Sequence, residues 1–262
     1  MTAPARLLWA LPALAGALLA GTLAWVVGMP GGEQTLGAFA TSVAARNAAQ
    51  VSNAHRAARA LDGAVVGPGE EFSFNERVGP WGPERGYRRA PVSYAGDIIW
   101  DWGGGVCQTS TTLYNAALLA GMTITERHRH HWPSDYVPPG LDAAVAQYDV
   151  DLRFRNPLNR PVTIRSRIEG DRLVCEIVGR GRAPVRYRIQ REVERVARPA
   201  RVIRPSAQLA SGRRRVVTRG RPGYRVVVYR VAVRSGHETC RELLHVDTYP
   251  PANSLIEIGS RE

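Results

Sequence analysis

The longest apolar stretch of this 262-residue chain lies near its start, where Leu7 to Gly28 contains no charged residue. At about 1.5 Å of helical rise per residue, such a run crosses the hydrocarbon core of a bilayer. Arg6 precedes the run, and a basic residue on the short side favours export of everything that follows. We therefore expect residues 1–30 to be a membrane anchor of a single-pass protein. The alternative is a signal peptide cleaved near Ala15–Ala17, which would give a secreted protein.

Two later segments have apolar residues at helical spacing, and both are followed by a glycine. They predict helices at residues 36–61 and at Val106–Ala120. Alternating apolar and polar positions predict strands at residues 71–74, 122–127, 144–154, 161–168, 172–178, 213–218, 224–234, 240–247 and 255–258. Residues 79–86, rich in glycine and proline, predict a loop, and residues 96–105 are glycine-rich and end in Gly103–Gly105.

This order of elements favours an α+β core domain with a mainly antiparallel sheet at residues 36–182. A small all-β module is expected at residues 190–262, because no helical pattern occurs there. The composition changes near residue 185, after Gly179–Gly181, and we place the boundary between the two there.

The charge of the chain is +12, and all 35 basic residues are arginines, which excludes a Schiff-base or general-base lysine. Residues 183–262 hold 17 arginines and seven acidic residues, so most of the excess charge lies in the C-terminal module. A basic module outside the cytoplasm points to an anionic cell-wall polymer or a membrane surface as partner, not to nucleic acid.

The strongest candidate for chemistry is Cys107, which follows Gly103–Gly105 and opens the second predicted helix. Unpaired N–H groups and the helix dipole at that end favour a thiolate and an oxyanion. Cys175 and Cys240 lie in or beside predicted strands, where they would be bridged or simply buried. An odd number of cysteines in an oxidising compartment leaves at least one unpaired.

A cysteine nucleophile needs a base and a group that orients the base, for which we select His130 and Asp142. The order of these residues along the chain resembles that of transglutaminase-like and papain-related enzymes, although this is an analogy of order alone. The residues expected to line the substrate site are Gly104, Gly105, Gln108, Thr109, Ser110 and Arg127.

Two alternatives stay open at this point. Cys107 and the glycines before it are equally consistent with inert packing at a helix start. His128 and His130 alternate along the chain and, with Cys107 or Asp142, would make a mixed zinc site. Neither a Cys-x-x-Cys nor a His-Glu-x-x-His pattern supports zinc, and we predict no metal and no cofactor.

Residues 40–180 resemble the VanW family, whose name comes from vancomycin-resistance gene clusters. The segments that carry the resemblance are Phe72–Pro80, Glu84–Tyr87, Gly103–Asn115, Glu126–His130, Tyr136–Pro138, Gly140–Ala143 and Asp151–Asn156. His131 stands where family members usually have serine, so no role of that serine is carried over. Residues 190–262, with five glycines and the ending Ile256–Gly259, resemble a G-five (G5) domain. That resemblance implies a surface protein with affinity for amino-sugar polymers.

Two hypotheses for function follow. The first is an exported enzyme that acts on peptidoglycan or its stem peptides, by acyl transfer or amide hydrolysis through Cys107, His130 and Asp142. The second is a non-catalytic wall-binding protein in which the same groove and the basic module bind together. A role in antibiotic resistance does not follow from the family name.

Overall fold

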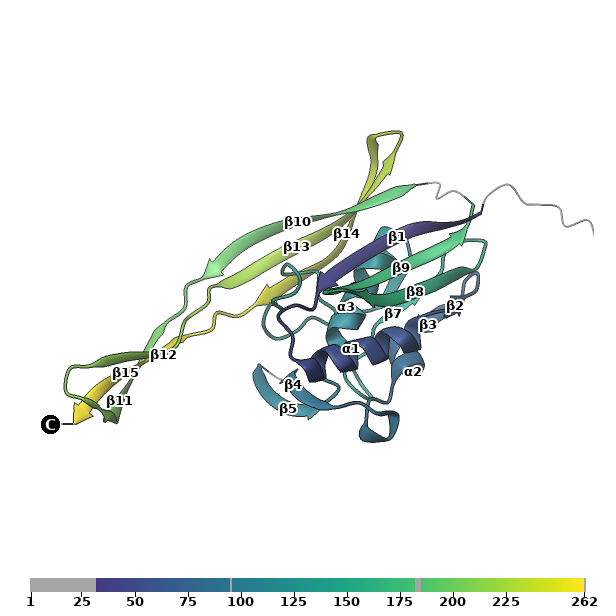
Figure 1. Ribbon diagram of the computed structural model, residues 1–262. Coiled ribbons are helices and arrows are strands. Elements are labelled where there is room, and N and C mark those ends of the chain that lie inside the picture. The colour runs from purple at the N-terminus through teal and green to yellow at the C-terminus, as the bar shows by residue number, and fades with distance from the viewer. Residues whose placement is uncertain (1–31, 95, 182–184, 262) are drawn as a thin grey trace, which may run out of the picture. The chain divides into compact units, whose positions relative to one another are not determined.

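The computed structural model describes residues 32–94, 96–181 and 185–261 (Figure 1). The predicted membrane segment, Leu7 to Gly28, lies outside these residues. Within the described part of the chain, no helix is long and apolar enough to cross a membrane.

A four-stranded antiparallel sheet forms the centre of the core domain. Its order is β1 (Glu33–Ser42), β9 (Arg172–Arg180), β8 (Val162–Glu169) and β2 (Val65–Val66). The helices α1 (Ala48–Leu61) and α3 (Val106–Leu119) pack against it, with α3 on β1 and β9 and α1 on β8 (Figure 1). All residues of α3 except Cys107 and Leu119 are buried, so this helix is the centre of the main hydrophobic cluster.

Gly37 sets the distance between β1 and α3. A Cβ atom on Gly37 would lie 2.3 Å from the backbone nitrogen of Ala120 and 2.6 Å from the carbonyl oxygen of Ala116. Only glycine lets the strand approach the end of the helix this closely.

The predicted helix at residues 36–61 is wrong in its first part, because residues 36–42 belong to β1. Main-chain pairing with β9 runs from Glu33 to Ser42, and this pairing outweighs the helical propensity of an alanine-rich segment. The helix begins only after Asn47, which with Gln50 makes a capping box.

A second, three-stranded antiparallel sheet has the order β3 (Glu71–Ser73), β7 (Arg153–Arg155) and β6 (Thr123–Glu126). The short helices α2 (Phe74–Val78) and η1 (Pro83–Arg85) follow β3. The strand predicted at residues 144–154 is reduced to isolated bridges and part of β7. The side-chain amide of Asn75 bonds to the carbonyls of Ala146 and Val150, which closes this segment as a turn, and Tyr148 takes a positive φ of 87° within it.

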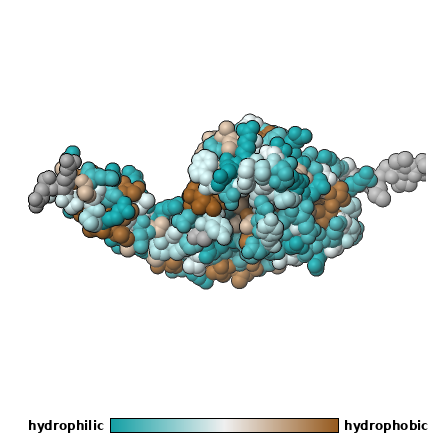
Figure 2. Space-filling model, turned by 90° about the horizontal axis from the view of Figure 1, so that it is seen from below, coloured by the Kyte–Doolittle hydropathy of each residue, from teal (hydrophilic) through white to brown (hydrophobic). Residues whose placement is uncertain are grey.

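The glycine-rich segment at residues 96–105 contains the strand β5 (Asp97–Trp102), which forms a hairpin with β4 (Arg89–Tyr94). Its large side chains are not covered: Tyr94, Ile98 and Trp100 are exposed. Figure 2, viewed from the side on which this hairpin lies in Figure 1, shows hydrophobic patches among hydrophilic surface on that face.

The C-terminal module is built from strands alone, as the sequence predicts. One antiparallel sheet has the order β10 (Arg186–Ala197), β13 (Gly223–Arg234) and β14 (His237–Tyr249). Another has the order β11 (Arg201–Ala210), β15 (Ser254–Arg261) and β12 (Arg214–Thr218), with β11 and β15 parallel. The prediction of an α+β core followed by an all-β module is thereby confirmed.

The contact at Gly37 leads to a prediction about stability. We expect Gly37→Ala to lower the free energy of unfolding by about 1–3 kcal/mol, because the added methyl group meets backbone atoms that cannot turn away. Gly32→Ala is the matched control, since a Cβ atom there meets nothing within 4 Å. Urea unfolding of both variants measures the difference, and equal midpoints would contradict this account of the packing.

Candidate functional site

Cys107 is the second residue of α3, the helix that begins directly after the three glycines. Gly103 and Gly105 have φ values of 81° and 106°, which favour glycine. A Cβ atom added to Gly104 would lie 2.6 Å from the carbonyl oxygen of Pro91. A Cβ atom added to Gly105 would lie 2.3 Å from the carbonyl oxygen of Gln50. The glycines therefore let the start of α3 approach α1 and β4, and so place Cys107 between these elements.

The three cysteines have very different surroundings. Cys107 is a partly exposed residue, and its thiol donates to the carbonyl oxygen of Val145 at 3.3 Å. Cys175 is buried beside Ser166, and burial raises the pKa of its thiol to about 12. Cys240 is exposed on β14, and all three cysteines are free. Of the three, Cys107 is the partly exposed one, and its surroundings affect the ionisation of its thiol.

His130 and Asp142 come from the segment between β6 and β7, and they are hydrogen-bonded to each other. Asp142 Oδ2 accepts from His130 Nδ1 at 2.8 Å and from the His130 backbone N–H at 2.6 Å. Both side chains are buried. The carboxylate thus holds the Nδ1 side of the ring and leaves Nε2 for a different partner.

The charges of Cys107 and His130 stabilise each other. Burial would raise the pKa of the Cys107 thiol, but hydrogen bonding with His130 and its positive charge outweigh burial and lower that pKa. Burial would lower the pKa of His130, but hydrogen bonds with Asp142 and Cys107 and their negative charges raise it to about 10. For Asp142, the hydrogen bond with His130 and the charges of Arg127 and His130 overcome burial and lower the pKa to about 2. At neutral pH these shifts favour a thiolate beside an imidazolium.

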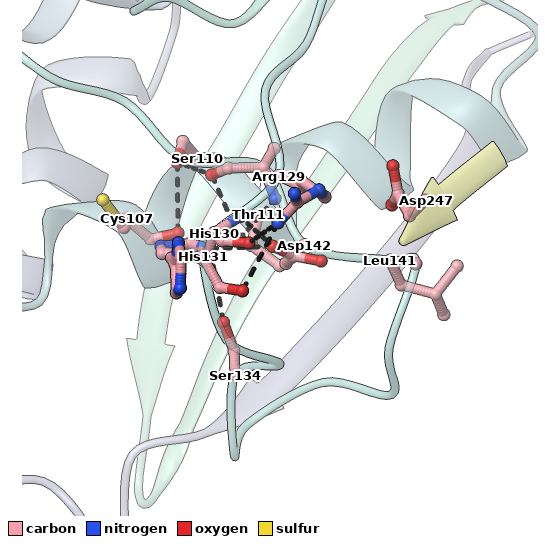
Figure 3. A network of polar contacts seen from close by, with 12 residues as sticks. Cys107, Ser110, Thr111, Arg129, His130, His131, Ser134, Leu141, Asp142 and Asp247 are labelled. Atoms are coloured by element: carbon pink, nitrogen blue, oxygen red, sulfur yellow. Dashed lines mark hydrogen bonds and ion pairs between the residues drawn. The ribbon is translucent and has the colours of Figure 1, made fainter. Parts of the chain in front are cut away.

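Cys107 and His130 line one pocket, and Asp142 is not among its lining residues. Figure 3 shows Asp142 beside His130. The walls come from Arg46 and Gln50 at the start of α1, Pro91–Ser93 of β4 and the segment Trp132–Tyr136, with Arg221 at one side. The pocket is therefore lined by a cysteine, a histidine, two arginines and part of β4.

The structure brings together Cys107, His130 and Asp142, as selected from the sequence. Of the expected substrate-site residues, Gly104, Gly105 and Gln108 also line the pocket. The remaining three, Thr109, Ser110 and Arg127, are not among its lining residues.

Each of these three side chains has a buried partner elsewhere. Thr109 donates to the carbonyl oxygen of Ala54 and Ser110 to that of Ala143. Arg127 bonds to Asp142 and to Asp247. They support the site from inside the fold and do not face a ligand in the pocket.

His128 does not join the proposed mixed metal site. Its Nε2 atom lies 2.9 Å from Glu126 Oε1, and the side chain is exposed. The described residues contain no group of three or more His, Cys, Asp or Glu side chains placed to hold a metal ion.

Sequence reasoning missed two residues that support the site, Asp247 and Tyr249 of β14. Tyr249 donates from its hydroxyl to Asp142 Oδ1 at 2.6 Å, and Asp247 Oδ1 accepts from Arg127 at 2.8 Å. These pairs are more than a hundred residues apart along the chain, and no local spacing or motif indicates them.

Comparison with known proteins gives two family matches. Residues 49–178 match the model described as VanW like protein, and residues 188–261 match the G5 domain. The chain is 40% identical over 144 residues to the uncharacterized protein YoaR of Bacillus subtilis (strain 168), an overlap of 55% of this chain and 48% of that protein. It is 27% identical over 146 residues to the vancomycin B-type resistance protein VanW of Enterococcus faecalis (strain ATCC 700802 / V583), covering 53% of each. The chain thus spans about half the length of these curated relatives.

Two solved structures resemble parts of the chain. The IgA1 protease G5 domain matches with 24% identity and a TM-score of 0.23, covering 30% of this chain and 92% of that one. The HP0197-G5 structure matches with 21% identity and a TM-score of 0.18, covering 29% of this chain and 100% of that one. From the family matches and the two relatives, the chain carries a VanW domain followed by a G5 domain.

Proposed function

We propose that this protein works at the cell envelope as a cysteine-dependent enzyme on peptidoglycan or its stem peptides. The observation that carries the proposal is the Cys107–His130–Asp142 arrangement, with its thiol at a pocket and its pKa shifts in the directions that a nucleophile requires. The VanW and G5 domains support a cell-wall setting. The apolar segment Leu7 to Gly28 would anchor the protein to the membrane or direct its secretion.

The chemistry we propose is acyl transfer through a thioester. The Cys107 thiolate attacks the carbonyl carbon of an amide, and the backbone N–H of Cys107 stabilises the oxyanion, because those of Val106 and Gln108 already donate to the carbonyl oxygens of Gly103 and Gly105. The His130 imidazolium gives its Nε2 proton to the leaving amine as the C–N bond breaks. Neutral His130 then takes a proton from water or from a second amine, which attacks the thioester and releases Cys107.

The pocket suggests how an extended peptide would reach the thiol. Its wall at Pro91–Ser93 belongs to the sheet β4–β5, in which β5 is the one partner that β4 has among the described strands. The carbonyl oxygen of Pro91 accepts from the side chain of Gln50, so the outer edge of β4 faces the pocket side. A peptide lying along that edge would use main-chain hydrogen bonds and present a carbonyl group to Cys107.

A second candidate function is binding without turnover. The G5 domain carries most of the net positive charge of the chain, and Arg46 and Arg221 lie at the pocket. An anionic wall polymer would bind to the basic G5 domain and to the arginines at the pocket without any reaction at Cys107.

The ionised thiol predicts a specific pH dependence of alkylation. In a Cys240→Ala background, iodoacetamide should label Cys107 with a midpoint below the usual thiol pKa of about 8.5. His130→Gln removes the lowering interactions and leaves burial, which raises the pKa, so its midpoint should lie above that of the parent. Alkylation rates from pH 5 to 10 measure both midpoints. A parent midpoint at or above the usual value would remove the basis for a nucleophilic Cys107.

Turnover of wall fragments tests the enzyme directly. Purified muropeptides incubated with the full chain should change in mass by cleavage or by transfer to an amine, and Cys107→Ala should abolish this change. Asp142→Asn should lower the rate by about 10⁴-fold, the scale seen when the orienting carboxylate of a triad is replaced. Cys240→Ala is the control that should keep full activity. If the wild type and Cys107→Ala gave identical product profiles, the binding function would replace the enzymatic one.

Charge in the G5 domain predicts salt-sensitive retention on cell walls. Retention of the full chain on isolated wall sacculi should fall as the salt concentration rises, because screening weakens contacts between exposed charges. Arg213→Gln with Arg214→Gln, both at exposed positions, should weaken retention at low salt. Arg59→Gln with Arg172→Gln removes the same charge from exposed positions of the VanW domain and is the matched control. Equal retention of the two double variants would argue against binding through the G5 domain.

A further inference from the structure

Four donors occupy the carboxylate of Asp142, and they come from both domains. Oδ2 accepts from the backbone and from the ring of His130, at 2.6 and 2.8 Å. Oδ1 accepts from the Tyr249 hydroxyl at 2.6 Å and from Arg127 at 3.3 Å. Both donors to Oδ2 therefore belong to the VanW domain, whereas Oδ1 accepts from Arg127 of the VanW domain and from Tyr249 of β14 in the G5 domain.

The direction of the Tyr249 hydroxyl is set by its neighbours. Its oxygen accepts the backbone N–H of Gly140 at 2.9 Å, which leaves its proton for Asp142 Oδ1 at 2.6 Å. The oxygen of Asp247 lies farther away, at 3.3 Å. Tyr249 is completely buried, so no solvent molecule replaces this donor easily.

Further contacts hold the segment that carries Asp142 against the G5 domain. His245 Nε2 lies 3.0 Å from the carbonyl oxygen of Gly140, and Arg191 donates to that of Pro139 at 3.0 Å. A small hydrophobic cluster joins the same parts of the chain. Its buried members are Val137, Leu141, Val226, Val228 and Tyr249.

Asp247 extends this support through Arg127. The guanidinium of Arg127 bonds at once to Asp247 Oδ1, to Asp142 Oδ1 and to the carbonyl oxygen of Asp142. All three side chains are nearly buried, so each charge depends on the others for its compensation.

From these contacts we infer that the G5 domain is a working part of the site, in which Tyr249 is a positioning residue that orients Asp142 and, through it, His130. The inference deepens the proposed function and rests on it for its effect on turnover. Its physical basis is that a carboxylate with one fewer donor is both less stable as an anion and freer to turn. The VanW and G5 domains would then act together and not as a catalytic part with a separate wall anchor.

Tyr249→Phe tests the inference, because it keeps the ring and removes only the hydroxyl. We expect the pKa of Asp142 to rise by about one unit, since the charged form loses a hydrogen bond. A ¹³C NMR titration of the Asp142 carboxyl carbon in the full chain measures this, with Asp142→Asn to assign the signal. In turnover assays kcat should fall by roughly tenfold while KM stays unchanged, because Tyr249 does not line the pocket.

Tyr229→Phe is the matched control, because Tyr229 lies on β13 of the same sheet and packs on Arg241, away from Asp142. It should leave both the titration and kcat unchanged. Asp247→Asn is a second test variant, and it should lower the pKa of Asp142, because it removes a neighbouring negative charge and leaves the Arg127 guanidinium to Asp142.

The inference is overturned if the Asp142 titration is the same in the wild type, Tyr249→Phe and Asp247→Asn. It is also overturned if kcat and the titration shift equally in Tyr229→Phe, because the effect would then be general loosening of the sheet. Failure of the proposed function is a separate result. It would appear as no turnover by the wild type, whatever the titration of Asp142 shows.

Discussion

The buried carboxylate of Asp142 is the interaction on which the site depends. An ionised group removed from water is stable only when its oxygens are fully hydrogen-bonded or paired with a cation, and Asp142 has both kinds of partner. These partners lie far apart in sequence, so the same charge that orients His130 also joins the end of β14 to the VanW domain. Stability and the state of the Cys107 thiol therefore depend on the same few contacts.

The helix that carries Cys107 is also unusual in how it is buried. Six polar side chains of α3 lie inside the fold, and each of them donates a hydrogen bond to a main-chain carbonyl oxygen. The buried polar residues are Gln108, Thr109, Ser110, Thr111, Thr112 and Asn115. Ser110 and Thr111 both donate to the carbonyl oxygen of Ala143, and Asn115 donates to that of Leu141. These bonds flank Asp142, so α3 holds from one side the segment that β14 holds from the other, and the distance between thiol and imidazole is set by a rigid frame.

The pH behaviour of this frame follows from the same pairing. Asp142, with a lowered pKa, contributes stability above its unfolded value near 3.8, and the contribution is lost as the pH falls toward 2. His130, with a raised pKa, contributes stability below about 6.5, and the contribution is lost as the pH rises toward 10. The contributions of both groups are therefore fully present between about pH 3.8 and pH 6.5.

Local pattern was sufficient for several features. The spacing of apolar residues predicted α3, the strands β8 and β9 and the all-β character of the G5 domain, and the glycines before Cys107 marked the start of the helix. Cys107, His130 and Asp142 were found because their residue types and order are those that nucleophilic chemistry needs. Alanine-rich residues 36–42 and the segment at 144–154 were assigned wrongly, because pairing with β9 and hydrogen bonds to Asn75 outweigh local preference there.

The linear order of residues is enough to show which side chains are chemically able to act, since that depends on residue type and near neighbours. It does not show which of them meet. Tyr249 and Asp247 approach Asp142 and Arg127 only because β13 and β14 fold back onto the segment that follows β6, and a contact across more than a hundred residues leaves no trace in local spacing. Whether the thiol ionises was likewise decided by the fold, because burial opposes the charge and only the three-dimensional placement of His130 overcomes it.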